Sequence, residues 1–498
     1  MNRGWLAVAV LLASTEAGSQ TPSTPPTRFG TARTLIQSGL ARESAPGLAI
    51  AVARGDSILW EEGFGWADLE RRIPVTVNTP FYLASTTKTI TATALMILRE
   101  RRRLDLDRPA NDYLGAARIW SPRWNANGAT VRHLATHKSG ITTFALDCPT
   151  STPDCPFPSM AELIRRYGVV SRPPGESFDY SNLGYDILGE VIAHAARKQL
   201  GAFMRDEIFA PLGMKHSSLG ADTTGAPVPA VPYFWGRGRV PYSRRSFAAS
   251  SAYSSVHDLV RFGQLHVKVR PPGVRAILSD AALDTMQWSV VSAGSQGSYG
   301  IGWWVDSSRF GYRSVVAQGG TSASATWMRL IPSERLVVVV LANKGVSFAS
   351  EVADAVIAEL LPRYAAGLDS TRRTPATSAP APAAALLDTS FVGAWTGVVR
   401  TESAEVKMQL TVSDSGAARA TFSSRPGDSP GRARFADRLF RLNIAGDLTT
   451  TDSTGGQRMY FYLRPGDRIM NGAVTLAVSA ASGLEGRVSY WVELERAK

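Results

Sequence analysis

The first hundred residues alternate between helical and extended hydrophobic patterns. A helical pattern of apolar residues runs from Phe29 to about Arg42. Ala49 to Ala53 then form an apolar run, Arg54-Gly55-Asp56 is typical of a turn, and Ser57 to Glu61 continue beyond it. Two extended runs joined by a short turn predict a β-hairpin between Gly47 and Gly63.

A second group of extended runs lies between residues 313 and 343. Ser314 to Ala317 and Ala323 to Ile331 are the first two arms, and after a turn Leu336 to Ala342 form a fully apolar return. A helix is predicted next, from about Phe348 to Leu361, while helical and irregular segments fill residues 85 to 270. Strands at both ends of a helical middle predict one large α+β domain, with its sheet assembled from both ends and a helical lobe inserted between them.

The hydrophobic texture changes after the large domain, which is predicted to end at residue 365. Residues 366–386 are rich in Pro, Ala, Thr and Ser, a composition typical of a linker. Beyond the linker, apolar and polar residues alternate from Val406 to Val412, and Val488 to Leu494 are also strand-like. Gly/Asp turns between such runs predict a small, barrel-like all-β domain over residues 387–498.

The N-terminus has the pattern of a secretory signal peptide over residues 1–19. Arg3 gives a positive start, Trp5 to Ala13 form a short apolar run, and the small residues Ala17 and Ser19 follow at the spacing of a cleavage site. The apolar run is too short for a spanning helix, and no other stretch of the sequence is long and apolar enough to cross a membrane. The sequence therefore predicts export to the periplasm or the extracellular space, with the large domain beginning near residue 28.

The two cysteines, Cys148 and Cys155, lie seven positions apart in a loop rich in Pro, Thr and Asp. In an oxidising compartment such a pair is expected to form a disulfide that staples the loop, and two free thiols are the alternative. Mass spectrometry of a non-reduced digest distinguishes the two states. Two cysteines alone do not make a usual structural zinc site.

Composition and charge restrict the class of protein. The 498 residues are 44% hydrophobic and 19% charged, as in ordinary globular proteins. The net charge of +12 is spread along the chain apart from Arg101-Arg102-Arg103, which indicates a solvated basic surface and no nucleic-acid-binding module. Weak attraction to anionic cell-envelope polymers is compatible with this charge.

Candidate chemistry begins at Ser85-Thr86-Thr87-Lys88, just before a predicted helix from Thr89 to Leu98. The unpaired backbone N–H groups and the dipole at a helix start favour negative charge that develops beside Ser85. Lys88 is three residues further on, so it lies on the same side of the helix as Ser85. A serine hydroxyl needs a base to become a good nucleophile, and a desolvated lysine amine is such a base, whereas arginine cannot deprotonate.

Two further segments carry candidate site residues. In Tyr180-Ser181-Asn182, a phenol that relays protons and a carboxamide that holds the lysine and a substrate carbonyl would share one side of a short loop. The alternative is a buried tyrosine beside a helix-capping asparagine. In Gln318-Gly319-Gly320-Thr321, the glycines permit close approach of the backbone to a ligand, and the N–H groups of Thr321 and Ser85 would form an oxyanion hole. A simple bulge or turn is the alternative there.

Taken in order, these motifs resemble those of the serine β-lactamase-related superfamily, which includes class C β-lactamases, penicillin-binding proteins, D-peptidases and related esterases. The motifs of that superfamily are Ser-x-x-Lys, Tyr-x-Asn and Lys/His-x-Gly. The resemblance covers about residues 30 to 365. Other segments match it in the same order: Gly63–Asp68, Leu104–Pro109, Val131–Gly140, Pro174–Tyr185, Pro211–Met214 and Tyr299–Trp303.

The resemblance implies a β-lactamase/transpeptidase-like fold, with an antiparallel sheet flanked by helices and a helical lobe, and it assigns roles. Ser85 is the acylated nucleophile, Lys88 and Tyr180 share general-base and general-acid work, and Asn182 orients Lys88 and the substrate. His133 and His137 stand four residues apart, as a metal pair would, but the superfamily carries them in a structural segment without metal. No metal and no cofactor are therefore expected.

One departure from the superfamily pattern changes the expected substrate. The third motif should begin with Lys or His, and here it begins with Gln318, which has no charge. Binding of a substrate carboxylate is then weakened unless an arginine elsewhere, such as Arg313, replaces the missing cation. Esters or amides with less negative charge become favoured.

The sequence therefore predicts an exported serine hydrolase of the esterase, D-peptidase or β-lactamase type. Its substrate is expected to be a small molecule, a short peptide or a cell-wall fragment. The alternative is a catalytically weak protein of the same fold that binds or scaffolds the cell wall. Nothing in the sequence sets the oligomeric state.

Overall fold

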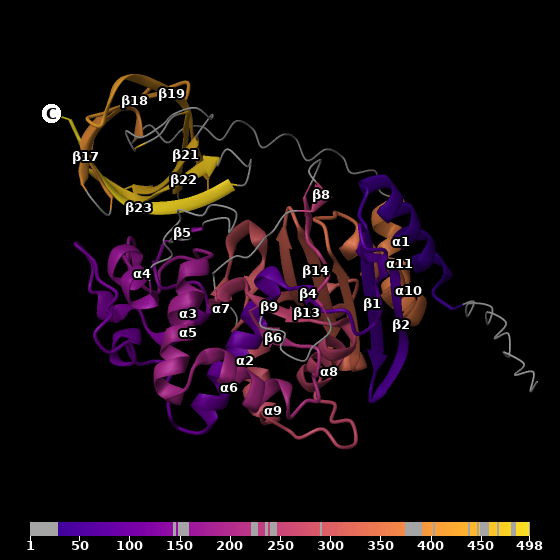
Figure 1. Ribbon diagram of the computed structural model, residues 1–498. Coiled ribbons are helices and arrows are strands. Elements are labelled where there is room, and N and C mark those ends of the chain that lie inside the picture. The colour runs from indigo at the N-terminus through magenta and orange to yellow at the C-terminus, as the bar shows by residue number, and fades with distance from the viewer. Residues whose placement is uncertain are drawn as a thin grey trace, which may run out of the picture.

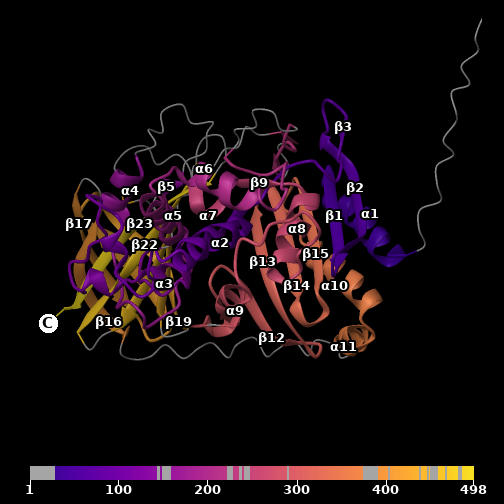
Figure 2. The same ribbon diagram turned by 90° about the horizontal axis from the view of Figure 1, so that it is seen from below.

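A nine-stranded antiparallel sheet forms the centre of the larger domain in the computed structural model (Figure 1). Three of its strands come from the N-terminal end of that domain: β1 (Gly47–Arg54), β2 (Ser57–Asp68) and β3 (Ile73–Pro74). The other six come from its C-terminal end: β10 (Val291–Ser292), β11 (Ser298–Tyr299), β12 (Trp304–Arg309), β13 (Tyr312–Thr321), β14 (Ser324–Ile331) and β15 (Leu336–Ala342). Their order is β10-β11-β12-β13-β14-β15-β1-β2-β3, and Figure 2 shows β13, β14, β15, β1 and β2 side by side.

The structure describes residues 28–142, 146–147, 159–220, 228–234, 238–239, 247–288, 291–373, 391–401, 404–436, 439–445, 448, 458–465, 468–479 and 485–497. The predicted signal peptide over residues 1–19 and the pair Cys148 and Cys155 lie outside these ranges. Within them, no helix combines the length and apolar character needed to cross a membrane.

Strands β1 and β15 join the two ends of the large domain. They pair antiparallel, with Leu48 opposite Ala342 and Arg54 opposite Leu336. Both strands are almost entirely buried because helices cover both faces of the sheet. The helices α1 (Gly30–Glu43) and α10 (Ala349–Leu360) pack on one face, and α8 (Val256–His266) packs on the other.

The predicted hairpin, the three later strands and the two flanking helices are all confirmed, with some ends shifted. The largest shifts are in β2, which was predicted to end at Glu61 and continues to Asp68, and in β13, where the prediction of Ser314–Ala317 was too short. The strand continues through the glycines because pairing with β14 is unbroken, with Gly319 opposite Thr326 and Gly320 opposite Ala325.

A helical lobe lies beside the sheet, as predicted, and α2 (Thr87–Glu100) runs between the two. Residues 87–98 of α2 are buried, so this helix is the core of the junction. The other helices of this region are α3 (Val131–Ala135), α4 (Met160–Tyr167), α5 (Asn182–Ala196), α6 (Leu200–Met204), α7 (Phe247–Ser250) and α9 (Asp280–Trp288). Short strands complete the region: β4 (Phe81–Tyr82), β9 (Ala252–Ser254) and β6 (Ser218–Leu219) form one small sheet, and β7 (Tyr233–Phe234) pairs with β8 (Gly238–Arg239).

The C-terminal part of the chain forms a closed antiparallel barrel, as predicted. Its strands are β16 (Gly393–Arg400), β17 (Glu405–Val412), β18 (Ala417–Phe422), β19 (Arg425–Ala436), β20 (Leu439–Ala445), β21 (Arg458–Pro465), β22 (Ile469–Ser479) and β23 (Glu485–Arg496). Pairing of β16 with β23 closes the barrel. Along β17, exposed and buried residues alternate strictly, which is the two-residue period expected of a strand with one face in a barrel core.

The barrel contacts the helical lobe through β23. The short strand β5 (Leu146–Asp147) pairs with it, with Leu146 opposite Val488. Arg123 forms an ion pair with Glu493 at 3.1 Å, and Figure 1 shows the barrel beside β5 and α4.

The predicted linker over residues 366–386 needs one correction. Its first eight residues, 366–373, belong to α11 (Pro362–Arg373), and residues 374–386 lie outside the described part of the chain. The abundance of Pro and Ala in the linker as a whole concealed this helix, although Pro362 sits at its first position, where proline is tolerated.

Candidate active site

Ser85 lies in a single 3₁₀ turn, Ala84–Thr86, that leads directly into α2. The preceding residue, Ala84, has a left-handed backbone with φ of 45°, which is costly for a residue with a side chain. The surrounding structure holds this turn in place. Thr326 on β14 donates from Oγ1 to the Leu83 carbonyl at 3.0 Å, and its hydroxyl lies 2.7 Å from that of Thr86. The sheet therefore fixes the position of Ser85.

The Lys88 ammonium is buried and reaches Ser85. Its side chain is 1% exposed, and Nζ donates to Ser85 Oγ at 3.0 Å. The other two donor directions end on Asn182 Oδ1 at 2.7 Å and on the Ala249 carbonyl at 3.0 Å. All three N–H donors of the ammonium are thus used. The geometry brings together Ser85, Lys88 and Asn182, as the sequence predicted.

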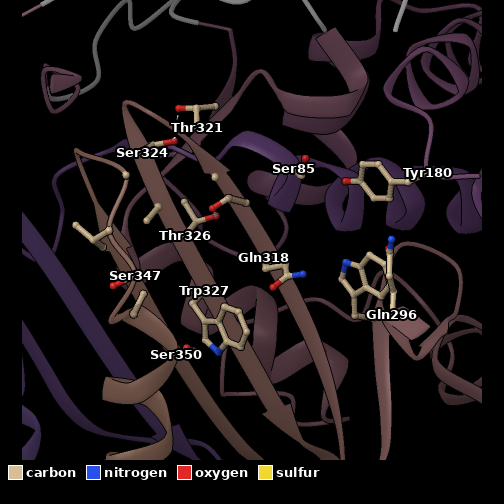
Figure 3. A pocket seen from close by; sticks show the side chains of 17 residues that line it. Ser85, Tyr180, Gln296, Gln318, Thr321, Ser324, Thr326, Trp327, Ser347 and Ser350 are labelled. Carbon is tan, nitrogen blue, oxygen red and sulfur yellow. Dashed lines mark hydrogen bonds between the residues drawn. The ribbon is translucent and has the colours of Figure 1, made fainter. Parts of the chain in front are cut away.

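Tyr180 stands across the cleft from Ser85. Figure 3 shows its phenolic oxygen pointing toward Ser85. Lys88 Nζ is 4.8 Å from the centroid of the Tyr180 ring, and the Trp304 ring lies parallel to it at 6.2 Å. The phenol is therefore placed to exchange a proton within the Ser85 cleft.

Asn182 is placed by the start of helix α5. Ser181 is the N-cap of that helix, since its Oγ accepts from the Gly184 N–H at 2.8 Å. The contact of Lys88 with the Ala249 carbonyl had no recognisable motif in the sequence. It depends on Asp186, one turn further along α5, which accepts from the N–H groups of Ala248 and Ala249 at 3.0 Å each and so holds α7 against α5. A carboxylate at four-residue spacing from Asn182 was the available signal for that anchor.

Two other phenols near Tyr180 differ from it in their surroundings. Tyr185 and Tyr299 are fully buried, and burial raises the pKa of each phenol well above its ordinary value. Tyr185 also donates its hydroxyl proton to the Ala135 carbonyl at 2.7 Å. These two residues therefore stay neutral, whereas Tyr180 is partly exposed to the cleft.

The third motif lies on the open edge of β13. Pairing of β12 with β13 reaches only Val316 in the described register, which leaves the following residues facing the Ser85 turn. A Cβ on Gly319 would stand 2.3 Å from the Leu83 carbonyl oxygen and 2.8 Å from the Ser85 nitrogen. Only glycine allows this approach, so Gly319 sets the distance between the strand and the nucleophile turn. The proposed role of the Thr321 N–H in an oxyanion hole stays a prediction.

Replacing Gly319 with alanine is expected to displace the Ser85 turn. The new methyl group overlaps backbone atoms that cannot move independently, so we expect a loss of about 1–3 kcal/mol of stability and roughly 100-fold of kcat. Gly320→Ala is the matched control for stability, because a Cβ there meets only the Ser324 carbonyl oxygen, at 3.9 Å. Thermal unfolding and ester hydrolysis check both variants. A Gly319→Ala protein as stable and active as Gly320→Ala would show that the close approach is not required.

A cavity of about 830 Å³ opens in front of Ser85 (Figure 3). Among the residues that the structure describes, the lining includes no charged side chain and consists of Ser85, Tyr180, Gln296, Trp304, Gln318, Gly319, Gly320, Thr321, Ser324, Ala325, Thr326, Trp327, Gly345, Val346, Ser347, Ala349 and Ser350. Gln318 and Trp327 are direct neighbours across β13 and β14. The wall opposite Tyr180 therefore presents a carboxamide and an indole.

Arg313 does not supply the cation that Gln318 lacks, so that sequence interpretation was wrong. Arg313 is five residues from Gln318 on the same strand, about 17 Å away at the usual rise of a β-strand. Its guanidinium lies 3.7 Å from the Trp288 ring centroid and donates to the Gln287 carbonyl. The odd residue offset also directs the two side chains to opposite faces of the sheet.

The two histidines considered as a metal pair lie in different environments. His133 Nδ1 lies 2.9 Å from the Gly128 carbonyl oxygen, while His137 is buried beneath Tyr180. In the described part of the chain, no group of three or more His, Cys, Asp or Glu side chains is close enough to hold a metal ion.

Comparison with known proteins finds similarity over the same region as the motifs. The family model described as Beta-lactamase matches residues 32–361. PbpX of Bacillus subtilis (strain 168) is 28% identical over 265 residues, which cover 52% of this chain and 62% of PbpX. Unguisins hydrolase ungD' of Aspergillus campestris is 26% identical over 329 residues, which cover 62% of this chain and 60% of that protein. The chain thus spans about three fifths of the length of these curated relatives.

A solved structure resembles almost the whole chain. The octameric penicillin-binding protein homologue from Pyrococcus abyssi is 21% identical and superposes with a TM-score of 0.59. The match covers 93% of this chain and 99% of that one. The likeness in fold therefore extends beyond the region matched by the family model.

Proposed function

The chain belongs to the beta-lactamase family of serine hydrolases, and from this premise we propose that it hydrolyses an ester or amide through an acyl-enzyme on Ser85. The observation that carries the proposal is the 3.0 Å contact between Lys88 Nζ and Ser85 Oγ at the start of α2. A buried amine on a serine hydroxyl has little structural purpose beyond activation of that hydroxyl.

Acylation begins when Lys88 in its neutral form takes the proton of Ser85. Its lone pair then faces the serine, and its two remaining N–H groups stay on Asn182 and the Ala249 carbonyl. Ser85 Oγ forms a bond to the substrate carbonyl carbon, and the oxygen of that carbonyl becomes negative. The N–H groups of Ser85 and Thr321 stabilise this oxyanion.

The tetrahedral intermediate collapses when its leaving group receives a proton. Tyr180 faces Ser85 across the cleft and passes the proton from Lys88 to the departing oxygen or nitrogen. Water then attacks the acyl-enzyme, the same residues remove a proton from that water, and the acid product and free Ser85 are released.

The expected substrate has an uncharged group where relatives of this family bind a carboxylate. Gln318 replaces the Lys or His of the third motif, and the residues of the described part of the chain that line the cavity are all uncharged. A carboxamide both donates and accepts hydrogen bonds, which suits an ester or a peptide group. Small esters, amides and peptides without a free carboxylate at this position are therefore favoured over anionic β-lactams.

Changing Gln318 to lysine is expected to shift selectivity toward substrates that carry a carboxylate. A charge-assisted hydrogen bond is about twice as strong as a neutral one, so the shift should be about 1 kcal/mol. The measurement is the ratio of kcat/KM for a short-chain aryl ester to that for a chromogenic cephalosporin. Gln296→Lys adds the same charge on the opposite wall and should shift the ratio less. If the native enzyme already prefers the cephalosporin and Gln318→Lys leaves the ratio unchanged, position 318 does not bind the carboxylate.

A hydrolysis panel tests the proposed function itself. Purified protein is offered short-chain nitrophenyl esters, D-amino-acid peptides and a chromogenic cephalosporin, and is also treated with a fluorophosphonate probe. We expect turnover of the esters and stoichiometric labelling of Ser85. Binding of cell-wall fragments without turnover or labelling would favour the weakly catalytic scaffolding protein instead.

We also propose that the protein is exported, on the basis of its N-terminal sequence. The mature protein should begin after residue 19, and its two cysteines should be joined in material from the oxidising compartment. Mass spectrometry of the intact and digested protein measures both. An unprocessed N-terminus in cytoplasmic material, with two alkylatable thiols, would contradict the proposal.

A further inference from the structure

One buried residue, His137, holds Tyr180 in place from several sides. It lies in the turn after α3, and its backbone is left-handed with φ of 58°. Its carbonyl accepts the N–H of Asp179 at 2.7 Å, and its ring Nδ1 accepts the N–H of Ser181 at 3.0 Å. The residues on both sides of Tyr180 are therefore hydrogen-bonded to the same histidine.

The imidazole also forms one wall of the site in which the Tyr180 ring sits. The two ring centroids are 4.3 Å apart at an angle of 33°, and the indole of Trp304 packs parallel to the phenol at 6.2 Å. His137 is itself fixed by Tyr185 and Tyr299, whose ring centroids lie 5.0 and 4.8 Å away. With 1% of its surface exposed, it has no freedom to move without repacking these rings.

The hydrogen bond from Ser181 determines the protonation state of the histidine. Because Nδ1 accepts, the ring proton must be on Nε2. Burial, followed by the nearby Lys88 cation, lowers the pKa of His137 well below its ordinary value, so the ring stays neutral. Nε2 is buried and has no hydrogen-bond partner among the described residues.

The unpartnered Nε2 is a cost that an apolar residue at this position would avoid. A leucine or phenylalanine would fill the space without burying an unsatisfied donor. The histidine is explained by its side-chain acceptor, because Nδ1 accepts the N–H of Ser181, next to Tyr180. We propose that His137 is a positioning residue that sets the Tyr180 phenol for proton transfer, an inference that rests on the proposed hydrolase function.

Two substitutions at position 137 separate positioning from packing. His137→Asn places Oδ1 where Nδ1 was and tolerates the left-handed backbone, but fills less space. His137→Leu fills the apolar surroundings and cannot accept a hydrogen bond. A positioning role predicts that Asn is the more active variant, whereas a packing role predicts that Leu is. His133→Asn, in the same segment but away from Tyr180, is the control.

The experiment measures kcat and KM for a nitrophenyl ester in full-length protein, with the active fraction counted by fluorophosphonate labelling. We expect kcat to fall roughly 100-fold in His137→Leu, as for a misplaced catalytic group, while KM changes by less than about threefold. His137→Asn should retain about tenfold more kcat than His137→Leu. His133→Asn should keep the native kcat.

Each other outcome overturns the inference. Equal kcat in native protein and His137→Leu, or a Leu variant more active than the Asn variant, would assign His137 to packing alone. If neither variant folds, His137 is required for folding and the positioning role is rejected. Ser85→Ala is measured alongside and gives the rate without the nucleophile. A native enzyme no faster than Ser85→Ala would contradict the proposed function. A native enzyme that is active, with His137 variants of equal activity, would contradict only this inference.

Discussion

Ser85→Ala is expected to abolish both hydrolysis and covalent labelling, with kcat falling by on the order of 10⁴-fold or more. The substitution removes the atom that Lys88 Nζ contacts at 3.0 Å and that would carry the acyl group. It leaves the turn intact, because the hydrogen bonds that anchor this turn come from Leu83 and Thr86. Ester turnover and fluorophosphonate labelling followed by mass spectrometry measure the loss.

A second hydroxyl in the same cavity provides the control for this prediction. Ser350 also lines the cavity, at the start of α10. Ser350→Ala should keep stoichiometric labelling. If Ser85→Ala is labelled as well as the native protein, the nucleophile is another hydroxyl of the cavity, and the assignment of Ser85 is wrong.

Local patterns were sufficient to predict the strands β1, β2, β13, β14 and β15 of the large sheet, but they did not predict β3, β10, β11 and β12. The strands β14 and β15 are apolar over most of their length. A turn-forming segment that begins at Pro332 separates them, so each strand has clear ends. The pair Ser85 and Lys88 was also local, since a spacing of three on a helix places two side chains together. The association of this pair with Asn182 and β13 came from the family resemblance, because nothing in the local sequence encodes contacts between residues as far apart as Lys88 and Asn182, which are 94 positions apart.

The parts of the site that the sequence did not predict are mostly backbone groups and buried anchors. The Ala249 carbonyl accepts from Lys88, yet any residue type provides such a carbonyl. Thr326 binds the Ser85 turn from a neighbouring strand, and a single threonine in a strand has no distinctive pattern. The family resemblance placed His137 in a structural segment, and its contact with the Ser181 N–H appears only when α3 and α5 are packed together.

Lys88→Arg tests whether position 88 needs a base or only a positive charge. Arginine keeps the charge but cannot lose its proton, so we expect it to be nearly as inactive as Lys88→Ala. Loss of a general base typically costs about 10²–10⁴-fold in rate, and kcat of both variants should fall in this range. The larger guanidinium must also fit where three acceptors already stand within 3.0 Å of Nζ.

A second buried lysine provides the control for the general cost of replacing a buried lysine with arginine. Lys344 is 9% exposed and donates from Nζ to the carbonyls of Glu43 and Ser44, a role that arginine can also fill. Lys344→Arg should therefore keep native kcat, while Lys88→Arg loses it. Single-turnover acylation by an aryl ester measures the step directly. If Lys88→Arg acylates at a rate near that of the native enzyme, Lys88 acts only as a fixed charge, and the proton of Ser85 must be taken by Tyr180, the phenol that faces it across the cleft.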